Sequence, residues 1–248
     1  MNILVIGLGN VAYSLVPALK NAGHNVENVS SREKILVSQN TDITIICTAD
    51  KGIEPVAEKL KTDSTVLHTS GSTDIEILKK NFENCGVIYP IQTFSKGKSV
   101  DFKSVPLLIE ASNESAFIKT EKLAKTISED VRKMTSEQRK FLHLAAVFAC
   151  NFTNHFIAVS KVLTETNGVD FNLLKPLIKE TFSKAESLDP ILCQTGPAQR
   201  NDSEILNLHL EMLKNEPLLK KIYSFVSENI MDFKTKYTDG IPRKTTKN

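Results

Sequence analysis

The chain of 248 residues lacks the features that mark several classes of protein. Its 31 Lys and Arg residues barely exceed its 29 Asp and Glu residues, so it has no electrostatic footprint for nucleic acid or an anionic membrane. The four cysteines form no CxxC pair. We therefore expect buried free thiols in a reducing compartment, and no metal site.

Long apolar segments and repeats are also missing from the sequence. The first apolar run, "ILVIG", is too short for a signal peptide and leads directly into glycine. We expect no run to approach the ~18 apolar residues that a membrane span requires. These absences favour a cytoplasmic globular protein with no membrane or nucleic-acid partner.

Short β-rich runs alternate with helical patterns in the first half of the chain. The expected strands are Ile3–Ile6, Val26–Val29, Ile43–Cys47, Thr65–His68, Gly86–Tyr89, Val105–Ile109 and Val131–Met134. The expected helices lie at 10–20, 52–61, 73–82 and 114–128. Such alternation predicts an α/β fold, with right-handed crossovers and a mostly parallel sheet covered on both faces.

The pattern changes at residue 135. The segment "TSEQ", Thr135 to Gln138, predicts a capping box, in which the two side chains satisfy each other's backbone donors. Only helical patterns follow, at about 136–167, 170–187, 203–214 and 216–236. We therefore expect two domains, 1–135 with the sheet and 136–248 with helices alone.

A strand, a glycine turn and an amphipathic helix open the chain, as "NILVIGLGNVAYSLVPALKNAG". The pattern Gly7-x-Gly9-x-x-Ala12 predicts a tight turn, a close backbone approach to a pyrophosphate and close helix–sheet packing, respectively. The pyrophosphate would contact the helix N-terminus, where Asn10 and Val11 lie. This order is typical of a dinucleotide-binding, Rossmann-like domain.

The end of the second expected strand indicates which dinucleotide. It reads Ser30-Ser31-Arg32, where an NAD-binding chain usually has an acidic residue. Hydroxyls and a guanidinium suit a 2′-phosphate, so we expect NADP. The alternative is that Arg32 is a solvated turn residue.

Further ligand groups are expected where later strands end, because open α/β sheets bind ligands at the carboxyl ends of their strands. The candidates for cofactor contact are Cys47, Thr48 and Ala49, and those for substrate contact are His68, Thr69, Ser70, Tyr89, Gln92 and Thr93. His68 either contacts a ligand or makes a local hydrogen bond. We expect Asp50 to be a helix N-cap and not a catalytic residue.

The segment "FLHLAAVFACNFTNH", residues 141–155, predicts a buried helix with one polar stripe. At about 100° per residue, Lys140, His143, Asn151 and Asn154 share that stripe. Buried amides and imidazoles need hydrogen-bond partners. The stripe therefore faces another helix, a water-filled cleft or a ligand.

Six motifs together resemble a bacterial family of NADP oxidoreductases that joins a Rossmann-like domain to a helical domain of unknown function. They are "GLGNVA", "SSR", "HTSGS", "YPIQTFSKG", "LHLAAVFACNFTNH" and "QTGPAQRND". The family is similar to pyrroline-5-carboxylate reductase, prephenate dehydrogenase, 6-phosphogluconate-type dehydrogenases and deazaflavin-dependent NADP reductase. The resemblance implies NADP in the first domain, a second domain that closes the cleft, and a homodimer through that second domain.

The chain departs from this wider group at one position. The 3-hydroxyacid dehydrogenases of the group carry a catalytic Lys four residues before an Asn on the long helix. If Asn151 is aligned with that Asn, Val147 occupies the lysine position. The usual ammonium proton donor is therefore absent, which disfavours a 3-hydroxyacid substrate.

These observations give a functional hypothesis. His143, Asn151 and Asn154 are expected to face the nicotinamide, with His143 exchanging a proton and the amides orienting a carbonyl or imine; alternatively, they make interhelical hydrogen bonds. In "QTGPAQRND", Gln194 and Arg200 are candidates for substrate contact, although Arg200 could instead pair with Asp202. We expect an NADPH-dependent reductase acting on a small carbonyl, imine or deazaflavin-like acceptor; the rival is a non-catalytic NADP(H)-binding sensor or regulatory protein.

Overall fold

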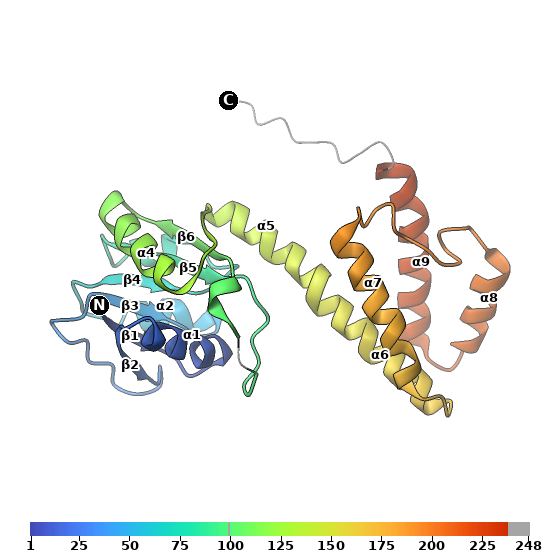
Figure 1. Ribbon diagram of the computed structural model, residues 1–248, viewed down its shortest axis with the longest axis horizontal. Helices are drawn as coiled ribbons and strands as arrows, with labels where there is room; N and C mark the ends of the chain where they lie inside the picture. The colour runs from blue at the N-terminus through green and yellow to red at the C-terminus, as the bar shows by residue number, and fades with distance from the viewer. Residues whose placement is uncertain (99, 238–248) are drawn as a thin grey trace. The chain divides into compact units, whose positions relative to one another are not determined.

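The computed structural model describes residues 1–98 and 100–237. The chain forms two compact units, Met1–Ala158 and Val159–Asn248 (Figure 1). The predicted change from strands to helices falls at residue 135, whereas the compact units separate at residue 158. The helix that starts at Ser136 belongs to the first unit up to that point, because its first turns are bonded to loops of the sheet.

The first unit contains a seven-stranded sheet in the order β2-β1-β3-β4-β5-β6-β7. The strands are β1 Asn2–Ile6, β2 Asn25–Val29, β3 Ile43–Ile46, β4 Thr65–His68, β5 Cys85–Pro90, β6 Leu107–Ala111 and β7 Val131–Lys133. All neighbouring pairs are parallel except β5 and β6. The predicted Rossmann-like, mostly parallel fold is confirmed.

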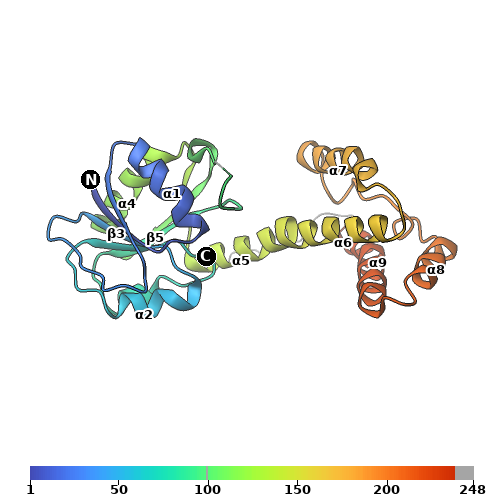
Figure 2. The same ribbon diagram turned by 90° about the horizontal axis from the view of Figure 1, so that it is seen from below.

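Helices cover both faces of this sheet (Figure 2). The helices α1 Asn10–Asn21 and α4 Glu114–Ile127 share one apolar core with the sheet, and α2 Ile53–Ala57 and α3 Glu76–Lys79 share the other. Parallel strands between two such layers are buried on both faces, which explains the continuous apolar run of β1. The helices α2 and α3 are shorter than predicted.

One continuous helix of 31 residues begins after β7. Its three parts are α5 Ser136–Ala146, a π-helical stretch Val147–Phe152, and α6 Thr153–Thr166. The predicted capping box is confirmed, because Thr135 Oγ1 accepts from Gln138 N and Thr135 N donates to Gln138 Oε1. The π-helical turns change the angular spacing from that of a straight α-helix.

The prediction that this helix is buried is wrong for the single chain. Phe141, Leu144 and Phe148 are 61%, 52% and 62% exposed. An 18-residue window of the helix has a mean hydropathy of 1.4, and none of it is buried. By length and composition alone the helix could cross a membrane, contrary to the expectation that no stretch could.

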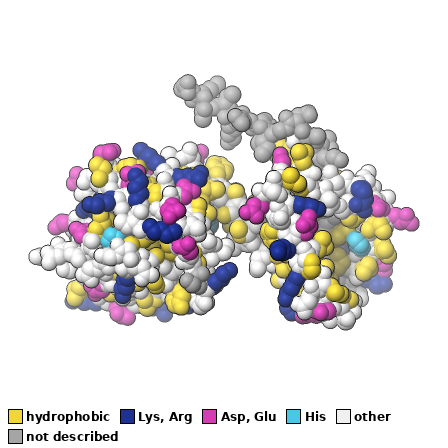
Figure 3. Space-filling view, viewed as in Figure 1, with side chains coloured by type: hydrophobic (Ala, Val, Ile, Leu, Met, Phe, Trp, Pro, Cys, Tyr) yellow, Lys and Arg dark blue, Asp and Glu magenta, His cyan; other side chains and the backbone are white. Residues whose placement is uncertain are grey.

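The second unit is helical in its described part. After the end of α6 it contains a 3₁₀ turn at Phe171–Leu174, then α7 Lys175–Ser187, α8 Ser203–Met212 and α9 Pro217–Tyr237. Pro176 lies in the first turn of α7, where its missing N–H costs nothing. Many large apolar side chains of this unit are exposed, and hydrophobic side chains are visible on its surface (Figure 3). Leu173, Leu192 and Phe225 are among the exposed residues.

Candidate functional site

The turn after β1 requires glycine at position 7. Gly7 has φ +131°, and its N–H donates to Val29 O at 2.8 Å. A Cβ atom there would lie 2.3 Å from Cys47 O, which no side chain could accommodate. Gly7 thus packs the turn directly against the end of β3, as the motif predicts.

Gly9 is different, because the protein itself leaves room for a side chain there. A Cβ atom on Gly9 would have Cys47 O, 4.0 Å away, as its nearest neighbour. Gly9 immediately precedes α1, whose N-terminus has no side-chain cap. The first N–H groups of α1, beginning with Asn10 and Val11, have no intrahelical acceptor and favour an anion.

Two side chains fix the surroundings of this turn. Asn28 donates through Nδ2 to Val5 O at 3.0 Å and to Gly7 O at 2.8 Å, which holds the turn from the β2 side. Asn10 Nδ2 donates to Phe94 O at 3.1 Å, which ties α1 to the loop after β5. Ala12 is buried, in agreement with the close helix–sheet packing expected of it.

The predicted phosphate-binding residues follow β2. Ser30 and Ser31 are partly buried, and the Arg32 side chain is exposed. The backbone N–H of Arg32 donates to Ser30 Oγ at 3.2 Å, so the three residues form a compact turn. Its hydroxyls and guanidinium lie at the carboxyl end of β2, one strand away from Gly7.

The predicted cofactor residues after β3 line the same edge of the sheet. Cys47 is buried, and burial raises the pKa of its thiol to about 12, so it stays protonated and is no nucleophile. The Oγ1 atom of Thr48 is buried without a hydrogen-bond partner among the described residues. Ala49 is exposed and caps the 3₁₀ turn that begins at Asp50. Asp50 is therefore not the N-cap that we expected; it accepts a hydrogen bond from Ser72 Oγ instead.

His68, the last residue of β4, is fully buried. Its Nδ1 accepts from Ser70 N at 3.1 Å, so Nε2 carries the proton, and no described group accepts it. Burial, followed by the positive charge of Arg139, lowers the pKa of His68 to about 3. Of its two expected roles, the structure shows the local hydrogen bond, and the ring is neutral near pH 7.

Tyr89 and His143 meet, although they come from β5 and α5. The Tyr89 hydroxyl lies 3.1 Å from His143 Nδ1, and the rings contact edge to face. Gly71 lies against both rings: a Cβ atom there would be 2.7 Å from Tyr89 Cζ and 2.8 Å from His143 Nδ1. Burial raises the pKa of Tyr89, so its phenol keeps its proton near pH 7 and can donate it in a hydrogen bond.

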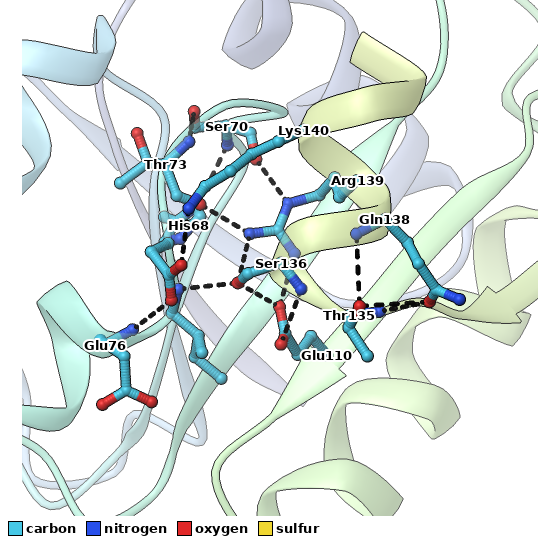
Figure 4. A network of polar contacts seen from close by, with 12 residues as sticks. His68, Ser70, Thr73, Glu76, Glu110, Thr135, Ser136, Gln138, Arg139 and Lys140 are labelled. Atoms are coloured by element: carbon cyan, nitrogen blue, oxygen red, sulfur yellow. Dashed lines mark hydrogen bonds and ion pairs between the residues drawn. The ribbon is translucent and has the colours of Figure 1, made fainter. Parts of the chain in front are cut away.

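Arg139 lies at the centre of a network of polar contacts around the first turn of α5 (Figure 4). Its side chain is 1% exposed and pairs with Glu110 Oε2 at 2.6 Å. It also donates from Nε to Ser70 O at 3.2 Å and from Nη2 to Thr73 O at 2.6 Å. The first turn of α5 is thereby fixed to both β6 and the loop after β4.

Arg139 and Glu110 are not among the residues predicted from the sequence. One signal was present, because Arg139 precedes His143 by four residues and so shares its helix face. Nothing in the sequence shows that Arg139 is buried or that its partner is on β6. Lys140, which was predicted to lie in the polar stripe, makes an exposed ion pair with Asp74 at 2.7 Å.

The remaining candidates of the first unit take no part in these hydrogen bonds. Gln92 and Thr93 are exposed, and Gln92 Oε1 accepts from Thr93 N at 2.8 Å. Asn151 and Asn154 are exposed; the π-helical turns lie between His143 and Asn154, so the straight-helix angles do not apply. Gln194 and Arg200 belong to the second compact unit. Among the described residues, no three His, Cys, Asp or Glu side chains gather as a metal site.

The fold and this edge of the sheet define the class: a Rossmann-like α/β protein with a helical C-terminal region. Residues 105–230 match the model of a domain of unknown function, DUF2520. A Bacteroides fragilis protein named as an NADP oxidoreductase is 34% identical, with a TM-score of 0.85 over 94% of this chain and 98% of that one. The chain belongs to the DUF2520 family, as the resemblance implied.

More distant structures share the fold. A Thermotoga maritima protein is 21% identical with a TM-score of 0.70, and 1-pyrroline-5-carboxylate reductase from Streptococcus pyogenes is 13% identical with a TM-score of 0.59. Each comparison covers 94% of this chain and 98% of the other. No curated protein matches the chain.

Proposed function

We propose that the protein is an NADP(H)-dependent oxidoreductase that transfers hydride between NADPH and a small carbonyl, imine or deazaflavin-like acceptor. The observation that carries this proposal is the open backbone at Gly9 before the uncapped N-terminus of α1. It lies where β1 separates β2 from β3, the switch point at which such sheets bind nucleotides. The Bacteroides relative, named as an NADP oxidoreductase, supports the cofactor.

The choice of NADP over NAD rests on the turn after β2. The Arg32 guanidinium is exposed and can bind a phosphate through two parallel hydrogen bonds, beside the hydroxyls of Ser30 and Ser31. An acidic residue at this position would instead hold the ribose hydroxyls of NAD. The cofactor would lie against the segment that follows β3, which contains Cys47, Thr48 and Ala49.

The proton would be exchanged through His143. Bound NADPH supplies the hydride, and the protein positions the acceptor and provides one proton. Tyr89 stays protonated, so it can donate to His143 Nδ1 and hold that ring in one orientation. The π-helical turns after His143 are consistent with a functional role, because such turns recur at functional sites.

Binding of NADPH and NADH to the wild type and to Arg32→Ala, measured by calorimetry, tests the cofactor proposal. We expect the wild type to prefer NADPH and Arg32→Ala to lose about 10- to 100-fold in NADPH affinity, the loss typical of charged hydrogen bonds. NADH affinity should hardly change. The matched control is Lys34→Ala, an exposed cation two residues away. Equal affinity of the wild type for the two cofactors would contradict the proposal.

The rival function is a sensor or regulatory protein that binds NADP(H) without turnover. Val147 occupies the position of the lysine that the related 3-hydroxyacid dehydrogenases use, which favours this rival. Screening carbonyl, imine and deazaflavin acceptors for NADPH oxidation separates the two functions. Tight NADPH binding with no oxidation by any acceptor would support the sensor.

We also propose that a second copy of the chain covers its exposed apolar surfaces in the cytoplasm. Phe141, Phe148 and Phe225 are each at least 61% exposed, which is costly for an isolated chain in water. A lipid bilayer is a less suitable cover for the long helix than a second copy is. The helix carries His143, Asn151, Asn154 and His155, and placing polar side chains in hydrocarbon costs free energy. Sedimentation equilibrium without detergent should give a dimer; a monomer, or a protein that needs detergent, would contradict this.

A further inference from the structure

The exposed carboxylate of Asp50 lies at the carboxyl end of β3, on the segment that leads into α2. Its Oδ2 atom accepts a hydrogen bond from Ser72 Oγ, on the loop after β4. None of the ion pairs within residues 1–98 and 100–237 includes Asp50, whereas Asp74, on the same loop as Ser72, is paired with Lys140. An ionised carboxylate has about four lone-pair sites, so Asp50 can accept further hydrogen bonds.

The loop that donates to this carboxylate is ordered by its own hydrogen bonds. Ser72 N donates to Ser70 Oγ at 3.2 Å, and Thr73 N donates to the same oxygen at 3.0 Å. Ser70 N in turn donates to Nδ1 of the buried His68 at 3.1 Å. The bond from Ser72 therefore joins Asp50 to a turn that is anchored at the end of β4.

The order of the strands sets the direction in which a dinucleotide would run. Strand β1 lies between β2 and β3. In the proposed function the 2′-phosphate lies after β2, at Arg32, and the pyrophosphate lies after β1, at Gly9. Neighbouring strands are about 5 Å apart, and a Cβ atom on Gly9 would have Cys47 O, at the end of β3, as its nearest neighbour. The half of the cofactor beyond the pyrophosphate is therefore expected over the ends of β3 and β4, where Asp50 and Ser72 lie.

The charge of Asp50 reaches the proposed site of proton exchange. Burial raises the pKa of Tyr89, Arg139 opposes this rise, and the Asp50 carboxylate adds to it. A carboxylate repels phosphate, so the part of the cofactor beside Asp50 is one that has hydrogen-bond donors and no negative charge. The nicotinamide ribose, which has two vicinal hydroxyls, meets both requirements.

We infer that Asp50 binds the vicinal hydroxyls of the nicotinamide ribose, and that Ser72 holds the carboxylate in place. The hydroxyls donate to the Asp50 carboxylate, in the way that acidic residues at strand ends hold a ribose in such folds. Hydrogen bonds to an ionised acceptor are about twice as strong as neutral ones. This inference rests on the proposed binding of NADP(H), and it assigns a residue to the reactive half of the cofactor.

Two probes, NADPH and adenosine 2′,5′-bisphosphate, separate this inference from the proposed function. The bisphosphate carries the adenosine and its 2′-phosphate but no nicotinamide ribose. In calorimetry, Asp50→Ala should bind NADPH about 10- to 100-fold more weakly than the wild type does, and should bind the bisphosphate equally well. The matched control is Asp63→Ala, at an exposed carboxylate before the amino end of β4, which should bind both probes as the wild type does.

An NADPH analogue that lacks the 2′-hydroxyl of the nicotinamide ribose identifies the group that Asp50 binds. The wild type should bind this analogue about tenfold more weakly than NADPH. Asp50→Ala should bind the two with nearly equal affinity, because the partner of the hydroxyl is already missing. Melting temperatures without cofactor show whether the variant is folded. If Asp50→Ala is not folded, Asp50→Asn keeps an oxygen for Ser72 and should show a smaller loss in the same direction.

The possible results lead to different conclusions. Wild-type NADPH affinity in Asp50→Ala, or the same loss with the analogue in both proteins, would overturn this inference and leave the proposed function standing. Equal losses for NADPH and the bisphosphate would mean that Asp50 supports the structure of the site as a whole, and would also overturn it. A wild-type protein that binds neither probe would contradict the proposed function, and this inference with it.

Discussion

The hydroxyl of Tyr89 and Nδ1 of His143 lie 3.1 Å apart, although 54 residues separate them in the chain. Tyr89 lies near the end of β5, and His143 lies about two turns into α5. Gly71 lies against both rings, and Arg139, four residues before His143, holds the adjoining loop. This contact joins two residues that the sequence had assigned to separate roles.

Removing either member of this pair should slow hydride transfer. Once a hydride acceptor has been identified, His143→Gln should lower kcat by about 10²- to 10⁴-fold, the range for loss of a general acid or base. Tyr89→Phe should have a smaller effect in the same direction, because it removes only the group that orients the ring. Tyr13→Phe, at an exposed tyrosine, is the control. Wild-type kcat in His143→Gln would exclude it as the proton donor.

A methyl group at position 71 should separate the pair. Gly71→Ala places a Cβ atom within 3 Å of both rings, so they must move apart. We expect a loss of about 1–3 kcal/mol in the free energy of unfolding, as in other overpacked sites. Urea unfolding measures that loss, and the NMR shifts of the His143 ring report the broken contact. Unchanged shifts and stability would mean that the loop relaxes freely.

The two glycines of the turn after β1 should respond in opposite ways. Gly7→Ala should destabilise the fold, because it meets Cys47 O and has a positive φ. Gly9→Ala has room and ordinary backbone angles, so stability should be unchanged or should rise by up to about 1 kcal/mol. NADPH affinity should nevertheless fall in Gly9→Ala, because its methyl group occupies space next to the helix N-terminus. Full NADPH affinity in a stable Gly9→Ala would argue against a pyrophosphate there.

The ion pair of Arg139 with Glu110 should contribute far more to the free energy of unfolding than the ion pairs on the surface do. Arg139→Met leaves the Glu110 carboxylate, which is only 18% exposed, without its partner. We expect a loss of about 3–5 kcal/mol in the free energy of unfolding. Lys161→Met breaks a pair whose members are both 52% exposed, and should cost less than about 1 kcal/mol. Similar losses in the two variants, measured by urea unfolding, would contradict this prediction.

Burial of neutral His68 should make stability depend on pH. Its pKa in the folded protein is about 3, below the usual histidine pKa of 6.5, mainly because burial disfavours the charged ring. The unfolded state therefore binds more protons between these values, and stability falls as the pH is lowered from 6.5 towards 3. The slope from this residue is at most about 1.4 kcal/mol per pH unit.

The matched variant is His68→Gln, which keeps polar atoms but does not titrate. Its free energy of unfolding should change less between pH 6.5 and 4.5 than that of the wild type, with both measured in urea. The carboxylates of the chain contribute equally to both proteins and cancel in the difference. Identical pH profiles would mean that His68 is protonated, or exposed, in the folded state.

The features predicted correctly from the sequence depend on local patterns. The strands, the glycine turn and the capping box at Thr135 each follow from residues close together in the chain. The positive φ at position 7 requires glycine, because other residues rarely adopt it. The glycine motif in the sequence predicts this requirement. The continuous apolar run of β1 shows burial on both faces, so the parallel sheet could be predicted as well.

Two predictions about the long helix depended on more than local pattern. Its apolar composition predicted burial, but composition cannot show what covers a surface, and the single chain leaves Phe148 exposed. The angular positions of Asn151 and Asn154 assumed a uniform helix, whereas π-helical turns begin at Val147. Whether those amides face a cofactor stays a prediction.

The sequence by itself determined the order of strands and helices along the chain, the turn at Gly7 and the helix that follows it, because each depends on neighbouring residues. Only the tertiary structure decided that Arg139 is buried against Glu110 and that Tyr89 touches His143. Partners on different elements become neighbours only when the sheet and its helices pack. Packing also excludes water around these groups, which strengthens the electrostatic attraction between partners that the sequence shows only one at a time.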